Sequence, residues 1–161
     1  MVKKEAVANT SSILFIAKLK RFDLIKNIFS KIFIPKEVVS EIFSKNYAEN
    51  ELINKEMQKF IFEKNVKEIK EFNLDMGERA AISLCLEKKI NIFLSDDKKA
   101  RKLARGLSIE TLGIAGIIKY NLEEKNISKE EAKDLINQLI KDGYYMSSIL
   151  YSELLILVGK D

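Results

Sequence analysis

Four short apolar segments, each followed by a helical pattern, constrain the fold of this chain more than any other feature. The apolar segments cover residues 6–9, 32–34, 90–94 and 108–112, and the helical patterns that follow begin near residues 10, 37, 97 and 115. Neighbouring parallel strands need crossover connections, which helices supply. The alternation therefore predicts an α/β fold, a three-layer α/β/α sandwich with a central, mostly parallel sheet.

Four further segments are interpreted as helical. Residues 46–72 form a charged stretch with one apolar side, and residues 77–88 repeat apolar positions at helical spacing. Ser128 and Glu131 have the spacing of a capping box, which opens a helix that Gly143 ends. A last helix, from about residue 147, is apolar nearly all round.

The length of the chain bounds the number of domains. At 161 residues, folding buries enough apolar surface for a core without disulfides or structural metal. We therefore expect a single domain over residues 1–161, in which the helices at 128–158 pack on the sandwich or extend it.

Histidine is absent from the sequence, and this absence excludes several kinds of site. Ser-His-Asp and Cys-His catalysis and the usual histidine-rich zinc sites all require an imidazole. The single cysteine, Cys85, has no second cysteine with which to form an internal disulfide. Any enzyme chemistry must rest on carboxylates, lysine or hydroxyl groups.

The distribution of apolar and charged residues bears on location and partners. No apolar run approaches the roughly 18 residues that a membrane span needs, so we expect a cytoplasmic protein without a membrane partner. The formal net charge of +4 permits an anionic partner.

Polar residues follow two of the predicted strands directly. Asn9 ends the first segment, and Ser95, Asp96 and Asp97 follow the third. In parallel α/β sheets, functional sites collect beyond the carboxyl ends of the strands. These residues therefore define a candidate site before any family is considered.

Two glutamates border apolar helical faces. Glu41 follows Val38 by three positions, but it could also pack its stem and reach water, or pair with Lys45. Glu78 lies beside Ala81 and Ile82, but with Asp75 it also has the spacing of a capping-box variant. Taken alone, each glutamate is explained as well or better by these local roles.

The pair Asp96 and Asp97 offers more acid than helix capping needs. One of them is expected to cap the helix that follows, which leaves the other unexplained. Carboxylates gathered at one sheet edge repel each other, and a divalent cation such as Mg²⁺ or Mn²⁺ relieves this repulsion. The pair therefore favours a metal site.

A row of basic residues starts beside these acids. The residues have helical spacing and are Lys98, Arg101, Lys102 and Arg105. A basic row next to a metal site suits the binding and cleavage of nucleic acid, whose phosphates need cations. The alternative is an ordinary solvated helix face.

Four motifs in this order resemble the PIN-domain family, in particular its VapC-like toxin ribonucleases. The first begins at Ala8-Asn9-Thr10-Ser11-Ser12-Ile13, and the second is Ile34-Pro35 followed by Val38 and Glu41. The third is Leu74-Asp75-Met76-Gly77-Glu78, and the fourth is Leu94-Ser95-Asp96-Asp97.

The resemblance implies a metal-dependent ribonuclease. Acidic side chains would hold Mg²⁺ or Mn²⁺, and the enzyme would use this metal to hydrolyse RNA phosphodiester bonds. The resemblance also implies a homodimer and a small antitoxin protein as partner. Glu41, Glu78 and Asp97 match the family's acids, with Asp96 adjacent. Asn9 stands where the wider family has aspartate, and its amide oxygen can ligate Mg²⁺ without bringing negative charge.

Two other interpretations remain. A catalytically silent PIN-like module would bind RNA or a partner protein through the same fold. A receiver-like phosphoacceptor domain also gathers acids at strand ends, although the helices after Ser128 and the stretch 46–72 fit it poorly.

Overall fold

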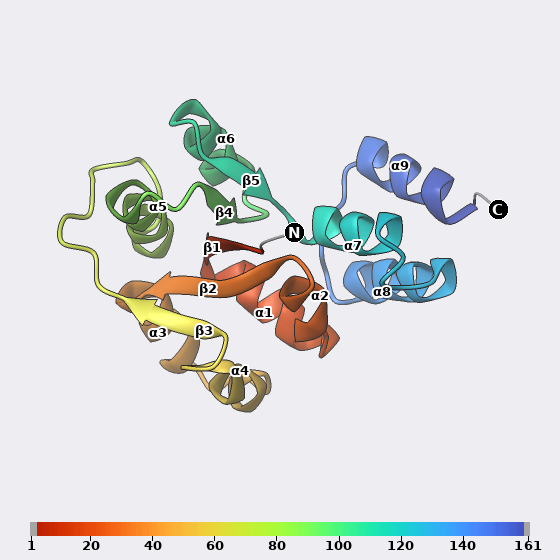
Figure 1. Ribbon diagram of the computed structural model, residues 1–161, viewed down its shortest axis with the longest axis horizontal. Helices are drawn as coiled ribbons and strands as arrows, with labels where there is room; N and C mark the ends of the chain where they lie inside the picture. Colours follow the sequence, from red (N-terminus) through yellow and green to blue (C-terminus); the bar gives the residue numbers. More distant parts are fainter. Residues whose placement is uncertain (1–2, 160–161) are drawn as a thin grey trace. The chain divides into compact units, whose positions relative to one another are not determined.

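A parallel sheet runs through the part of the chain before residue 115. The computed structural model describes residues 3–159, and in this range five strands lie side by side in the order β3-β2-β1-β4-β5 (Figure 1). The strands are β1 (Lys4–Ala8), β2 (Phe29–Pro35), β3 (Ile61–Lys64), β4 (Ile92–Leu94) and β5 (Glu110–Leu112). Every neighbouring pair is parallel, so the predicted α/β sandwich is confirmed.

Helices connect the strands. They are α1 (Thr10–Leu19), α2 (Phe22–Lys26), α3 (Lys36–Phe43), α4 (Asn50–Glu56), α5 (Met76–Lys88) and α6 (Lys98–Gly106). The chain passes from β1 to β3 in one direction and then places β4 and β5 on the other side of β1. Right-handed crossovers therefore put α1 to α4 on one face of the sheet and α5 and α6 on the other.

The core follows from the alternation of side chains along the strands. Val7, Phe33 and Phe93 lie in one buried cluster with residues of α5 and α6, such as Ala81 and Ala100. The alternate strand residues, among them Ala6, Ile32 and Ile34, are completely buried and belong to the opposite face. Apolar side chains on both faces of the sheet are what a parallel sheet between two helical layers requires.

The prediction of helix over residues 46–72 is largely wrong. Only α4 is helical there, and residues 61–64 form the edge strand β3. Ile61 pairs with Ile32 of β2 and is completely buried, so pairing with the sheet outweighs the local helical pattern. The short helix α2 was not anticipated either.

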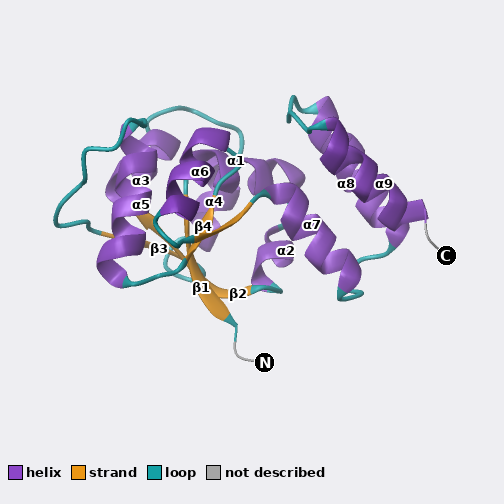
Figure 2. Ribbon diagram, turned by 90° about the horizontal axis from the view of Figure 1, so that it is seen from above, coloured by secondary structure: helices purple, strands orange, loops and turns teal. Residues whose placement is uncertain are grey.

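A second compact unit begins at Ala115 and contains most of α7 (Ile114–Glu123), together with α8 (Lys129–Lys141) and α9 (Ser148–Gly159). The capping box of Ser128 and Glu131 is present, and Gly143, with φ of +91°, follows the end of α8. Helices α8 and α9 pack against each other (Figure 2).

Helix α9 is apolar but incompletely covered. Leu154 and Val158 are buried, whereas Ile149 and Ile156 are 73% and 59% exposed. The residues 128–158, expected to pack on or extend the sandwich, fall within this second unit. Among the described residues, no helix has the length and apolar character that crossing a membrane demands.

Candidate active site

Asn9 and Ser95 join the carboxyl ends of β1 and β4. Asn9 directly follows β1, and its Nδ2 donates a hydrogen bond to Ser95 Oγ over 3.0 Å. Its Oδ1 accepts from the Ser12 backbone N–H at 3.1 Å, so Asn9 caps α1. Asn9 is 3% exposed and Ser95 is completely buried. The two predicted strand ends thus meet through a buried side-chain hydrogen bond.

Asp97 is the aspartate that caps a helix. Its Oδ2 accepts from the Ala100 N–H at 2.7 Å, and its own N–H donates to Ser95 Oγ at 3.1 Å. The predicted capping role for one member of the pair is confirmed. Ser95 therefore orients both Asn9 and the start of α6.

Asp96 points elsewhere. Its Oδ1 accepts from the Ile114 N–H at 3.0 Å, after the end of β5. A Cβ atom on Gly113 would lie 2.5 Å from Asp96 Oδ1 and 2.7 Å from Arg101 Nη1, so a larger residue there would displace one or both of these side chains. The neighbouring aspartates thus have different surroundings: Asp97 adjoins Ser95, and Asp96 adjoins Gly113 and Arg101.

Glu41 is held by two other helices. The Thr10 hydroxyl at the start of α1 donates to Glu41 Oε2, and the Gly77 N–H at the start of α5 donates to Oε1 at 3.2 Å. A Cβ on Gly77 would lie only 2.7 Å from Glu41 Cδ. The partners of this carboxylate are therefore Thr10 and Gly77 rather than Lys45.

Glu78 stands in the first turn of α5 and has an unusual titration. Burial raises its pKa to about 7, and the negative charges of Asp97, Asp75 and Glu41 add to the rise, while Lys99 opposes it. Asp75 makes no side-chain capping bond, so the capping-box interpretation does not describe this pair. Glu41, Glu78 and Asp97 thus share one electrostatic environment, although 56 positions separate the first from the last.

The donor groups suit a hard divalent cation. Carboxylate and amide oxygens are the ligands that Mg²⁺ and Mn²⁺ prefer, and a cation would relieve the repulsion that raises the pKa of Glu78. Within residues 3–159, no three acidic or thiol groups already converge as a ready-made metal cage. The types of donor group therefore suit a divalent cation, but side chains such as Glu78 would have to rotate before they could ligate it together.

The basic residues of α6 divide into two sets. Lys98 and Lys102 are exposed on the helix. Arg101, which is half-buried, and Arg105 line a shallow depression of about 440 Å³ with Ser108 and Thr111. The guanidinium of Arg101 is also near Asp96, so its charge is partly directed into the protein.

Three residues support the predicted ligands: Thr10 and Gly77 were not placed in the site from sequence, and Ser95 was placed there without a specific role. Thr10 and Gly77 orient Glu41, and Ser95 orients Asn9 and Asp97. All three stand beside a predicted acid or amide within the four motifs, and this adjacency was the only available signal.

Comparisons with known proteins agree with this architecture. A family model described as a PIN domain matches residues 5–160. A solved structure with a similar fold is a PilT N-terminus domain protein from the hyperthermophilic archaeon Sulfolobus solfataricus P2. Its TM-score is 0.54 at 18% identity, and the match covers 74% of this chain and 94% of that chain. No curated protein sequence matches. Since the family model spans nearly the whole sequence and the fold agrees, the chain belongs to the PIN-domain family.

Proposed function

We propose that this chain is an endoribonuclease that hydrolyses RNA phosphodiester bonds with Mg²⁺ or Mn²⁺, and that it is the toxin of a toxin–antitoxin pair. PIN domains are generally nucleases and typically use divalent metals. The observation that carries the proposal is the common electrostatic environment of Glu41, Glu78 and Asp97. Such an environment is costly without a counter-ion and useful with one.

The chain's own residues have distinct tasks in this proposal. Glu41, Glu78, Asp97 and the Asn9 amide oxygen would hold the cation, with Asp96 close by. Without the cation, burial and neighbouring negative charges raise the pKa of Glu78 to about 7, and a bound cation would favour the ionised carboxylate that can ligate it. When bound, a divalent cation supplies charge neutralisation for the phosphodiester and makes water easier to deprotonate. Thr10 and Gly77 fix the direction of the Glu41 carboxylate.

RNA binding is assigned to the basic residues of α6. Lys98, Arg101, Lys102 and Arg105 follow Asp97 on one helix, so phosphates bound along it would lead to the acids. A small antitoxin protein and a second copy of the chain are the proposed protein partners. The exposed apolar residues of α9 support a homodimer.

A catalytically silent binding module is the second candidate. Both groups of the Asn9 amide are occupied, one by Ser12 and one by Ser95, and the side chain brings no negative charge. This favours a structural role for Asn9 and a weaker cation site.

Cleavage of a mixed single-stranded RNA pool separates the two functions. The protein is incubated with the pool in millimolar Mg²⁺ or Mn²⁺, in EDTA, and as an Asp97→Asn variant. We expect cleavage only in the wild type with metal. Binding of RNA without cleavage in either metal would support the silent module instead.

A further inference from the structure

The edge of the sheet where the strands begin carries lysines in place of acids. A groove of about 700 Å³ is lined by Lys3, Lys26, Lys55 and Lys59, with Glu56 as the acid among its lining residues. Glu56 is already engaged, because Lys26 Nζ lies 2.8 Å from its Oε2. The groove therefore keeps a clear positive excess.

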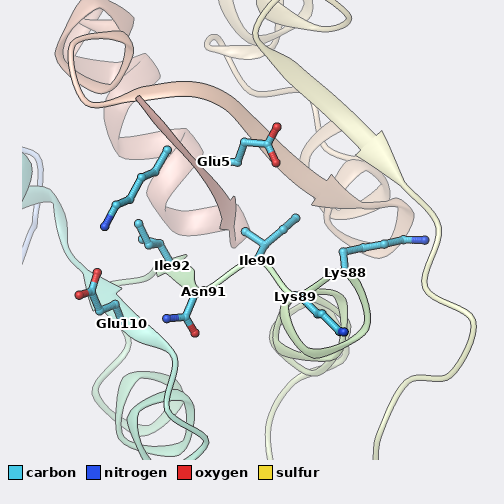
Figure 3. A pocket seen from close by; sticks show the side chains of 8 residues that line it. Glu5, Lys88, Lys89, Ile90, Asn91, Ile92 and Glu110 are labelled. Carbon is cyan, nitrogen blue, oxygen red and sulfur yellow. The ribbon is translucent and has the colours of Figure 1, made fainter. Parts of the chain in front are cut away.

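A second hollow at the same edge has the same character. Lys4, Lys88 and Lys89 line it together with Glu5 and Glu110, around a volume of about 370 Å³. Figure 3 shows Lys88 and Lys89 on one side of Asn91 and Glu110 on the other. The two hollows together have seven lysines and three glutamates, an excess of four. This excess equals the formal net charge of the entire chain, +4.

Helix dipoles explain only part of this accumulation. Lys26, Lys55 and Lys88 lie in the last turns of α2, α4 and α5, where a positive charge is favourable. Lys4 belongs to β1, and Lys59 lies between α4 and β3. Local stabilisation of helices gives no reason for lysine at these two positions.

The surface chemistry indicates the partner. The apolar residues in the two hollows are nearly covered: Phe29 and Phe60 are 2% and 5% exposed, and Ile90 and Ile92 are each 9% exposed. Protein interfaces have an apolar or aromatic centre and few lysines. A lysine-rich surface without such a centre suits a polyanion, whose phosphates lysines bind as point charges.

We propose that the edge of the sheet where the strands begin, with its two lysine-lined hollows, binds the phosphate backbone of RNA outside the segment that is cut. We call this surface the amino edge. The inference rests on the proposed function, because it assigns a binding surface to the part of the RNA substrate that flanks the cleaved bond. Strands of a parallel sheet all point the same way, so the acids and this surface lie at opposite edges. The seven residues of β2 span roughly 23 Å. At about 3.4 Å per stacked nucleotide, an RNA must have on the order of seven nucleotides to reach both edges.

The double variant Lys4→Glu/Lys59→Glu tests the proposal, with one change in each hollow. Neither lysine forms an ion pair within residues 3–159, so the change reverses the charge at both positions without breaking one. Lys129→Glu/Lys133→Glu on α8, where Lys133 is exposed and Lys129 is partly exposed, is the control. Fluorescence anisotropy without metal gives the affinity for RNAs of about 4 to 30 nucleotides across a salt series, independently of cleavage.

The Lys4→Glu/Lys59→Glu variant, called the amino-edge variant, should bind the longest RNA about tenfold more weakly than the control variant. Its slope of log affinity against log salt should fall by about 1.4, for two lost phosphate contacts. The shortest RNAs should be bound equally by both variants. Equal affinities and salt slopes of the two variants for the long RNA would overturn the proposal. It would also be overturned if the amino-edge variant bound polyglutamate more weakly but RNA as well as the control does, because the edge would then suit an acidic protein.

Lysine acetylation of the wild type gives a second measurement that does not depend on the variants folding. A long RNA should protect Lys4 and Lys59 from the reagent and leave Lys129 and Lys133 reactive. Unprotected Lys4 and Lys59 would overturn the proposal. Protection without any cleavage in Mg²⁺ or Mn²⁺ would leave this surface in place and reject the nuclease.

Discussion

Gly77 is the residue where one added carbon would disturb the candidate site most directly. Its N–H donates to Glu41, and its missing side chain leaves the space that the Glu41 carboxylate occupies. We predict that Gly77→Ala displaces this carboxylate and lowers metal-dependent cleavage by about 10- to 100-fold, as loss of an orienting group at a metal site does. A Mn²⁺ titration of the cleavage rate measures the effect.

Gly106→Ala is the control for this prediction. No atom lies within 4 Å of the Cβ position on Gly106, which is the last residue of α6. Alanine there should leave cleavage unchanged and stabilise the fold by about 0.4 to 1 kcal/mol. If Gly77→Ala cleaves RNA with the same metal dependence as the wild type, the present position of the Glu41 carboxylate is not needed for cleavage.

Glu78 should make the stability of the metal-free protein fall as pH rises. Its pKa goes from an ordinary 4.5 to about 7 on folding, chiefly through burial. Between these values the folded state holds a proton that the unfolded state has released, so the free energy of unfolding declines through this window. Above pH 7 the full cost of the buried charge remains.

The variant Glu78→Gln removes this cost. Because the side chain is partly exposed, solvent screening limits the gain to about 1 kcal/mol, or about 2 to 4 °C in Tm at pH 8. At pH 4 the two proteins should melt alike. Thermal unfolding in EDTA from pH 4 to 8 is the measurement, with the exposed Glu153→Gln as control. A wild-type Tm that rises from pH 5 to 7 relative to Glu78→Gln would contradict the prediction.

Asn9→Asp should lower the metal concentration needed for cleavage by about tenfold. Aspartate and asparagine cap helices equally well, so the bond from the Ser12 N–H can persist, and the Ser95 hydroxyl can donate in place of the lost amide. The change therefore adds negative charge with little change of shape. The measurement is a Mg²⁺ and Mn²⁺ titration of RNA cleavage at fixed pH. Unchanged or weaker metal dependence with no gain in rate would show that Asn9 is not a ligand.

At the scale of elements, Asp97 links metal binding to the start of α6. We predict that Mn²⁺ at a hundredfold excess over its Kd stabilises the wild type by about 2.7 kcal/mol, or roughly 5 to 10 °C in Tm. Asp97→Asn keeps a good helix cap but loses the charge, so its shift should be much smaller. Equal shifts in thermal unfolding of both proteins would exclude Asp97 from the cation site.

Elements with an unbroken local pattern could be predicted from sequence. Helix α5 and strand β4 follow apolar periodicity, and the acids that border them could be placed at one sheet edge because parallel strands end together. Strand β3 could not be predicted, because its burial depends on pairing with β2, some thirty residues earlier. Sequence likewise left open which of Asp96 and Asp97 caps α6, since that depends on the approach of Gly113 and Ile114.

At the scale of the whole molecule, the comparison structure and the family model cover different shares of the chain. The archaeal PilT N-terminus domain protein is matched over 94% of its length by 74% of this chain, so about a quarter of this chain lies outside that match. The family model, however, extends to residue 160. The C-terminal helices α8 and α9 therefore lie within the part of the chain that the family model matches.

These helices lead to a prediction about assembly. Ile149 and Ile156 on α9 are largely exposed, which is costly unless another surface covers them. We predict a homodimer, with about twice the 18.5 kDa of one chain in light scattering at tens of micromolar. Ile149→Glu should weaken the dimer at least tenfold, whereas Ser152→Glu, an exposed change on the same helix, serves as control. A monomeric wild type at this concentration would reject the prediction.

The hydrogen bonds of the candidate ligands have an evolutionary consequence. Asn9 and Asp97 cap helices and Glu41 ties α1 to α5, whereas Glu78 accepts no hydrogen bond within the described part of the chain. In a descendant released from selection for cleavage, folding alone would preserve the first three, and Glu78 would drift. An intact trio in such a relative would therefore say little about its chemistry, while an apolar residue at the position of Glu78 would mark a lineage that no longer cuts.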